Sequence, residues 1–138
     1  MTCPFCDTAK IKDRTIFSDE LVRVILSDPR LLPGHTLIIP KRHVEDPNEL
    51  TEKELLAIFK QINHIRTKML ETIATGVDIR QNYRPFLRQS EIKVDHVHFH
   101  VIPRTFEDEL YKKSMIHEKE LFKNLNDDEL ERFLNQFG

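Results

Sequence analysis

The chain has 138 residues and a formal net charge of −2 at pH 7, with 39% hydrophobic and 32% charged residues. This length fits one domain with a substantial core, and the near-neutral charge argues against bulk nucleic-acid binding. The sequence has no apolar run near the ~20 residues of a membrane span and no signal-peptide pattern at its start. We therefore expect a cytoplasmic protein with no membrane partner.

The first part of the chain predicts three strands. Residues 15–18 and 21–27 resemble the two strands of a hairpin, with residues 19–20 at its turn. Residues 35–40, HTLIIP, predict a buried strand that is closed by its proline.

A long helix is predicted next. Thr51 and Glu54 form a capping-box pattern, and apolar residues recur at helical spacing from there to about Gly76. Residues 77–83 then predict a further strand. The order of strands, helix, strands and a helical tail favours an α+β fold with a largely antiparallel sheet. In the tail, Asn126 is the expected N-cap of the last helix.

Histidines at every second position mark the segment DHVHFHVI. In a strand, side chains alternate between faces, so His96, His98 and His100 would share one face and the apolar residues between them the other. Pro103 is expected to end this strand because proline cannot donate to a sheet ladder. Three imidazoles on one face favour metal ligation or nucleophilic or acid–base catalysis over simple packing.

The chain has two cysteines, Cys3 and Cys6, in a C-x-x-C pattern. In a reducing compartment this spacing indicates a metal knuckle or a redox pair more than a structural disulfide. A redox pair is expected on a thioredoxin-like βαβ unit, and the predicted elements contain none.

The segment HVHFHVI, residues 96–102, matches in full the motif of the histidine triad (HIT) family, in which three histidines alternate with apolar residues. The segment SDPRLLPGHTLIIPKRHV also resembles this family, and the resemblance covers roughly residues 3–104. It implies a five-stranded antiparallel sheet with a long central helix in a domain of residues 1–104, and a homodimer. Residues 105–138 are then expected to be a C-terminal helical extension packed on the same domain.

The resemblance implies that His98 is a nucleophile. It would attack the α-phosphorus of a nucleotide, and water would cleave the nucleotidyl-histidine intermediate. A neutral imidazole with an ordinary pKa of about 6.5 is competent for this step. Its second nitrogen needs an acceptor, for which the family uses a backbone carbonyl. His100, if protonated, would offset charge on the phosphoryl oxygens.

In some family members an N-terminal C-x-x-C joins two histidines in a zinc site. Here the matching residues are Cys3, Cys6, His43 and His96. Two cysteines and two histidines form a sound structural zinc set that is closed to substrate. The resemblance therefore implies one structural Zn²⁺.

Further residues match substrate contacts of the family. Asp28 matches the residue that binds ribose hydroxyls, His35 a histidine near the active site, and Asn82 a side chain that holds the phosphate or leaving group. Lys93 stands where the family usually has a hydroxyl residue. The basic loop 84–93 would favour a longer or more highly charged polyphosphate chain.

The leading hypothesis is therefore an enzyme, a nucleotide hydrolase or nucleotidyl transferase. Its expected substrates are dinucleoside polyphosphates such as diadenosine tetraphosphate, or nucleoside phosphoramidates. One alternative is a zinc-stabilised nucleotide-binding or partner-docking module with little turnover, which the intact His98 argues against. Another is repair of adenylated nucleic-acid ends, for which the sequence offers no strongly basic stripe.

Overall fold

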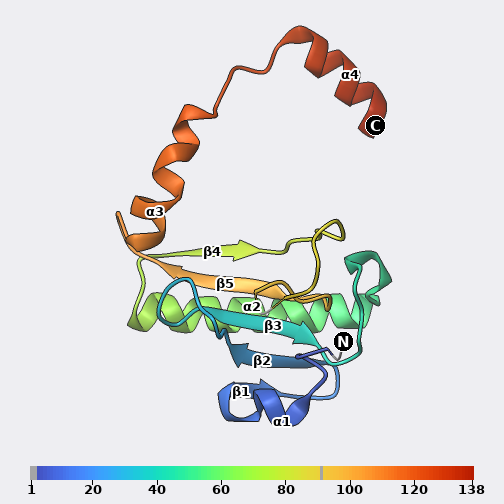
Figure 1. Cartoon of the computed structure of the whole chain (residues 1–138), viewed down its shortest axis with the longest axis vertical. Coiled ribbons are helices and arrows are strands. Elements are labelled where there is room, and N and C mark those ends of the chain that lie inside the picture. Colours follow the sequence, from blue (N-terminus) through green and yellow to red (C-terminus); the bar gives the residue numbers. More distant parts are fainter. Residues whose placement is uncertain (1–2, 91) are drawn as a thin grey trace. The chain divides into compact units, whose positions relative to one another are not determined.

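The computed structural model describes residues 3–90 and 92–138. The chain divides into two compact units, the first ending at Phe106 and the second formed by Glu107–Gly138. Figure 1 shows that the first unit holds all the strands together with the longest helix. Within the described ranges, no helix is both long enough and apolar enough to cross a membrane.

The first unit is built on one antiparallel sheet of five strands in the order β1-β2-β3-β5-β4. This confirms the predicted α+β class and five-stranded antiparallel sheet. Four pairings, all antiparallel, connect neighbours in that order. The strands are β1 (Thr15–Ser18), β2 (Val22–Leu26), β3 (Thr36–Pro40), β4 (Gly76–Arg80) and β5 (Phe99–Arg104).

The helix α2 (Glu52–Thr72) lies along one face of this sheet (Figure 1). Its start is the predicted capping box: the Thr51 hydroxyl accepts from the Glu54 amide at 3.1 Å, and the Glu54 carboxylate accepts from the Thr51 amide at 3.0 Å. The helix ends at Thr72, earlier than the predicted limit at Gly76. The 3₁₀ turn η2 (Pro47–Glu49) precedes it.

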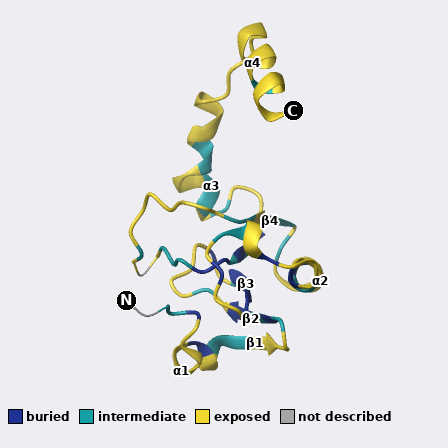
Figure 2. Ribbon diagram, turned by 90° about the vertical axis from the view of Figure 1, so that its right-hand side faces the viewer, coloured by how far each residue is buried: buried dark blue, intermediate teal, exposed yellow. Residues whose placement is uncertain are grey.

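Two apolar clusters cover the two faces of the sheet. Beneath α2 lies the larger one, which includes Val24, Ile38, Val97, Phe99 and Val101. The strand residues between these belong to the opposite face, as the period of two requires. The second cluster lies on the opposite face and comprises Phe5, Ile11, Ile25, Leu37 and Ile39. Ile11 is the last residue of the short helix α1 (Thr8–Ile11), which is followed by the 3₁₀ turn η1 (Lys12–Arg14). Figure 2 shows β2 and β3 as heavily buried strands, and every residue of β3 is buried.

The predicted limits of the histidine strand were wrong. β5 begins at Phe99 and runs through Pro103. Pairing of β5 with β3 ends at Val101, and beyond that residue β5 is paired only with β4. One side of β5 is therefore a sheet edge at Pro103, and a proline is tolerated at an edge. His96 and His98 precede the strand, but the alternation persists there, because Val97 donates to the Val44 oxygen at 2.6 Å and is buried.

β4 is also shorter than the predicted strand 77–83. Its last residue, Arg80, pairs with His100, and residues 81–83 are outside the sheet. Since β5 begins at Phe99, residues 82 and 83 have no strand residue opposite them. The loop that follows connects this end of β4 to the histidine segment.

The second unit contains α3 (Glu109–Lys113), η3 (Met115–Glu120) and α4 (Asp127–Phe137). The Asn126 side chain accepts from the Glu129 amide at 2.8 Å, which confirms the predicted N-cap of the last helix. Packing of residues 105–138 on the first unit stays a prediction.

Candidate functional site

The four predicted zinc ligands, Cys3, Cys6, His43 and His96, come together, with one donor atom from each inside a span of 4.8 Å. Cys3 Sγ lies 3.4 Å from His96 Nδ1, and Cys6 Sγ lies 3.4 Å from His43 Nδ1. The two Nδ1 atoms are 3.2 Å apart. A tetrahedron with Zn–S bonds of about 2.3 Å and Zn–N bonds of about 2.0 Å has edges of roughly 3.3–3.8 Å. Donor types and spacing therefore fit a tetrahedral zinc ion.

The contacts of the outer ring nitrogens of His96 and His43 also fit a zinc site. The His96 Nε2–H donates to the Pro40 oxygen at 2.7 Å, which leaves Nδ1 as the donor atom toward the cluster. His43 Nε2 lies 3.5 Å from a Glu45 carboxylate oxygen. A hydrogen-bonded partner of the kind that His96 has fixes the tautomer and orientation of a metal-binding imidazole. Burial and the neighbouring Cys3 raise the pKa of Cys6 to about 11, so without a bound cation this side chain is a thiol at neutral pH.

The C-x-x-C segment forms a tight turn, in which the Cys6 amide donates to the Cys3 oxygen at 3.2 Å. Inside this turn Phe5 is buried. Its ring meets the His98 ring edge-on, with centroids 5.2 Å apart, and the His96 ring at 5.9 Å. The N-terminal turn thus contacts the histidine segment through a side chain as well as through the cluster.

His98 has the features of a nucleophile. Its Nδ1–H donates to the His96 backbone oxygen at 2.7 Å, so the lone pair is on Nε2. Burial lowers the pKa of His98 below its ordinary value, although the hydrogen bond to His96 opposes that shift. The ring is therefore neutral at physiological pH, with one nitrogen free to form a bond.

His35 and His100 form a second pair with defined proton positions. The Leu31 amide donates to His35 Nδ1 at 3.1 Å, so the proton of His35 is on Nε2 and is donated to His100 Nδ1 at 2.9 Å. The proton of His100 is consequently on its Nε2. Its ring lies against that of His98, with centroids 4.9 Å apart.

Both rings of this pair are held neutral. The pKa of His100 is lowered to about 3, first by burial and then by the neighbouring His98 and His35, because protonation of more than one of these rings would place like charges together. The pKa of His35 is lowered to about 4, again mainly by burial and then by Arg80. The structure gives His100 as a neutral ring with its proton on Nε2, so a hydrogen bond from Nε2, and not a full positive charge, is what this ring offers to phosphoryl oxygens.

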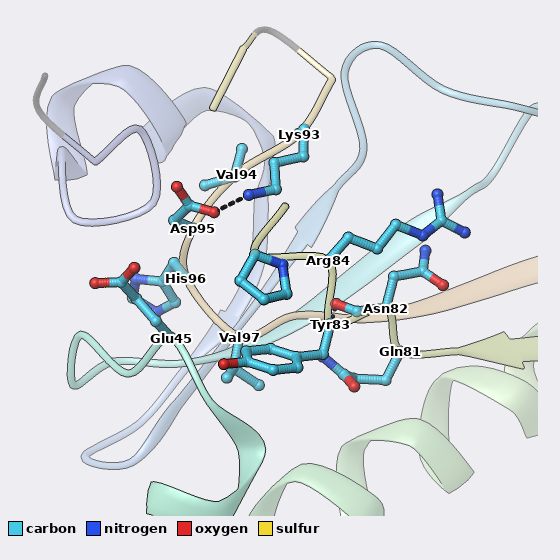
Figure 3. A pocket seen from close by; sticks show the side chains of 11 residues that line it. Glu45, Gln81, Asn82, Tyr83, Arg84, Lys93, Val94, Asp95, His96 and Val97 are labelled. Carbon is cyan, nitrogen blue, oxygen red and sulfur yellow. Dashed lines mark hydrogen bonds and ion pairs between the residues drawn. The ribbon is translucent and has the colours of Figure 1, made fainter. Parts of the chain in front are cut away.

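Two of the predicted substrate contacts line a pocket of about 130 Å³ beside the cluster (Figure 3). They are Asn82 and Lys93. The ammonium of Lys93 donates to the Leu87 oxygen at 2.7 Å and pairs with Asp95, so it is bound within its own loop. The lining residues are Glu45, Gln81, Asn82, Tyr83, Arg84, Pro85, Lys93, Val94, Asp95, His96 and Val97.

The other predicted substrate contacts, Asp28 and His35, lie outside this pocket. Asp28 is exposed in the turn after β2, and His35 is buried beside His100. Their roles stay predictions.

One charged residue near the histidines was missed by the sequence reasoning. Arg80 stands directly opposite His100 in the pairing of β4 with β5. The sequence does place Arg80 in a predicted strand. Its neighbour across the sheet could not be predicted, because it depends on the register between two strands that are separated by an irregular loop.

Comparison with known proteins gives a family and several relatives. The model of the HIT domain family matches residues 8–107. An uncharacterised HIT-like protein of Methanocaldococcus jannaschii is 32% identical over 104 residues, covering 74% of this chain and 78% of the relative. An adenosine 5′-monophosphoramidase of Schizosaccharomyces pombe is 30% identical and covers 78% of each chain. An asymmetrical bis(5′-nucleosyl)-tetraphosphatase of that organism is 32% identical over 54% of this chain and 40% of its own.

Solved structures show the same fold. A member of the HIT family from Bacillus subtilis superposes with a TM-score of 0.73 at 24% identity, covering 99% of this chain and 95% of that one. A Zn-bound histidine triad family protein from Mycobacterium smegmatis gives a TM-score of 0.67 at 29% identity, with 80% of each chain covered.

Proposed function

The chain belongs to the histidine triad family, and from that premise we propose that it is a nucleotide hydrolase or nucleotidyl transferase with His98 as its nucleophile. The observation that carries this proposal is the 2.7 Å hydrogen bond from His98 Nδ1 to the His96 oxygen, which leaves Nε2 unprotonated. His98 Nε2 attacks the α-phosphorus of a nucleotide and a phosphorus–nitrogen bond forms. The bond from phosphorus to the leaving group breaks.

The surrounding residues support each stage of this reaction. Bond formation at Nε2 makes the His98 ring cationic, and its Nδ1–H donates to a carbonyl oxygen that stabilises the charge. His100 holds a proton on Nε2 next to this ring, which suits hydrogen bonding to a phosphoryl oxygen or to the departing group. Water then attacks phosphorus: a phosphorus–oxygen bond forms, the phosphorus–nitrogen bond breaks, and one proton of the water passes to solvent. The nucleotide is released and the neutral His98 ring is restored.

We propose Cys3, Cys6, His43 and His96 as the ligands of a structural zinc ion. When bound, the ion supplies a cross-link between the N-terminal turn and the histidine segment, with no position for substrate. His96 is then a ligand, and its backbone oxygen serves the nucleophile.

The proposed substrates are dinucleoside polyphosphates or nucleoside phosphoramidates. Relatives named as a tetraphosphatase and as a monophosphoramidase support both classes. Asp28 is proposed to accept hydrogen bonds from ribose hydroxyls, and Asn82 to contact the phosphate or leaving group. Thiol ligands in a zinc site suit a reducing compartment, and we place the protein in the cytoplasm.

The assembly proposed is a homodimer. One flank of α2 exposes an apolar stripe, and such a patch on a soluble protein marks an interface. Its residues are Leu55, Leu56, Phe59 and Leu70 of the helix and Ile73, its C-cap. Light scattering after size exclusion should give twice the mass of the chain, and Leu56→Arg should give the single mass. A monomeric parent protein would contradict the dimer.

Mass spectrometry of the protein mixed with diadenosine tetraphosphate or adenosine 5′-phosphoramidate tests the function. An adenylyl group on the peptide that contains His98, released with time, is the expected result. Tight binding of nucleotide with neither adduct nor product would contradict the enzyme and favour the zinc-stabilised binding module.

A further inference from the structure

We propose that Arg80 and Arg84 form a phosphate subsite beside His100, which binds the phosphates of a polyphosphate leaving group. The inference rests on the proposed function, because it takes His98 as the point of attack. It adds residues outside the histidine motif and explains how this chain would select among the substrates of that chemistry.

The position of Arg80 comes from the sheet. Arg80 and His100 are directly paired across β4 and β5, and directly opposed residues of an antiparallel pair project from the same face. The opposite face of β5 carries Phe99 and Val101, which pack with α2. Arg80 is therefore on the histidine face, at its β4 side.

The guanidinium of Arg80 lacks a strong partner within the protein. Among the residues that the structure describes, it donates no hydrogen bond, and its one ion pair is a 3.9 Å approach to Asp78 Oδ2. That same oxygen is 2.5 Å from Arg104 Nη1, so Arg104 is its main partner. The Arg80 side chain is only 36% exposed. A partly buried cation with unused donors is suited to an anionic ligand.

Arg84 adds a second guanidinium, in the loop that follows β4. It lines the 130 Å³ pocket together with Asn82, and Figure 3 shows the two side chains extending to the same side of their loop, away from the Lys93–Asp95 pair. After burial and the neighbouring histidines, the charges of Arg80 and Arg84 contribute to the low pKa of His100. The strand pairing places Arg80 beside His100, and Arg84 lines the pocket in the loop that follows the same strand.

Whether Arg80 and Arg84 contribute to the reaction depends on whether the leaving group carries phosphates. When His98 attacks the α-phosphorus of a dinucleoside tetraphosphate, the departing group carries three further phosphates and their charge. An arginine binds such oxygens through two parallel hydrogen bonds. The leaving amine of a phosphoramidate has no phosphate, so the same reaction with that substrate gains nothing from the subsite.

Arg80→Gln tests the subsite, with Arg80→Lys as the variant that keeps the charge. Lys60→Gln, on the exposed side of α2 across the sheet, is the control with the same change in charge. The value of kcat/KM is measured for diadenosine tetraphosphate and for adenosine 5′-phosphoramidate. Loss of a charge-assisted hydrogen bond typically costs about 10- to 100-fold. We expect that loss on the tetraphosphate, a change below about twofold on the amidate, and partial recovery in Arg80→Lys.

Inhibition gives a second readout at the same site. ATP, which carries the additional phosphates, should inhibit Arg80→Gln about tenfold less than the parent protein, whereas AMP should inhibit both equally. Equal losses on both substrates, or unchanged inhibition by ATP, would overturn the subsite while leaving the His98 reaction in place. Failure of the parent protein to form an adduct with either substrate would instead overturn the proposed function.

Discussion

His98 Nδ1 lies 2.7 Å from the backbone oxygen of His96, whose ring nitrogen Nδ1 belongs to the Cys/His cluster. One residue therefore serves two centres: its side chain is a proposed metal ligand and its carbonyl fixes the tautomer of the proposed nucleophile. A displacement of His96 would therefore also shift the His98 imidazole, which is hydrogen-bonded to it.

His98→Ala should remove adduct formation and reduce turnover by several orders of magnitude, because it deletes the atom that attacks phosphorus. Binding of AMP, measured by calorimetry, should fall far less. His64→Ala, at an exposed position of α2, is the control. A His98→Ala protein that hydrolyses nucleotides at the parent rate would show that the covalent mechanism is wrong.

Zinc should be present at one ion per chain in protein purified without added metal. Elemental analysis of the parent protein and of Cys3→Ser/Cys6→Ser makes the comparison, and the double variant should lose the ion. Because metal binding to such a site is coupled to folding, a chelator should lower the melting temperature before it affects the chemistry. A well-folded, active parent protein without zinc would refute the site and return His96 to the possible catalytic groups.

Much of this site was predictable because its pattern is local. The C-x-x-C spacing and the alternating histidines each lie within a few residues, and the capping box at Thr51 and Glu54 is equally local. Arg80 was not predictable, since its place opposite His100 depends on a pairing between distant segments. Pro103 was misread because its tolerance in β5 depends on where β3 begins: the first residue of β3, Thr36, pairs with Val101, so β3 has no residue opposite Pro103.

Phe5→Leu should slow the reaction without removing the metal. The edge-on contact of Phe5 with His98 helps to hold the imidazole, and leucine keeps an apolar side chain without an aromatic edge. We expect kcat to fall several-fold with KM nearly unchanged and zinc content unchanged. Phe5→Ala should in addition destabilise the fold by about 3–5 kcal/mol, as truncations of buried aromatic residues do.

The readout that separates positioning from packing is the Nδ1–H signal of His98 in proton NMR. It should broaden in Phe5→Leu through exchange with water if the ring loses its fixed orientation. Ile11→Val, in the same apolar cluster, is a packing control. If Ile11→Val reduced kcat as much as Phe5→Leu, the effect would be one of general stability, and the contact would have no special role.

The stability of the fold should decrease on acidification through the His35–His100 pair. Folding lowers the pKa of His35 to about 4 and of His100 to about 3, whereas both have values near 6.5 in the unfolded chain. The unfolded state therefore binds more protons below about pH 6.5, so stability is full above that pH and is lost as the pH falls toward the folded values. Each of the two histidines should lower the free energy of unfolding by on the order of 1–2 kcal/mol between pH 7 and pH 5.

Urea unfolding of zinc-loaded protein at several pH values measures this slope. His35→Asn/His100→Asn removes both groups and should flatten the dependence of the free energy of unfolding on pH over that range. His64→Asn changes a histidine that is exposed on α2 and should leave the slope as it is in the parent protein. An equally steep slope in the double variant would mean that acid sensitivity originates elsewhere and that the pair takes up protons in the folded state.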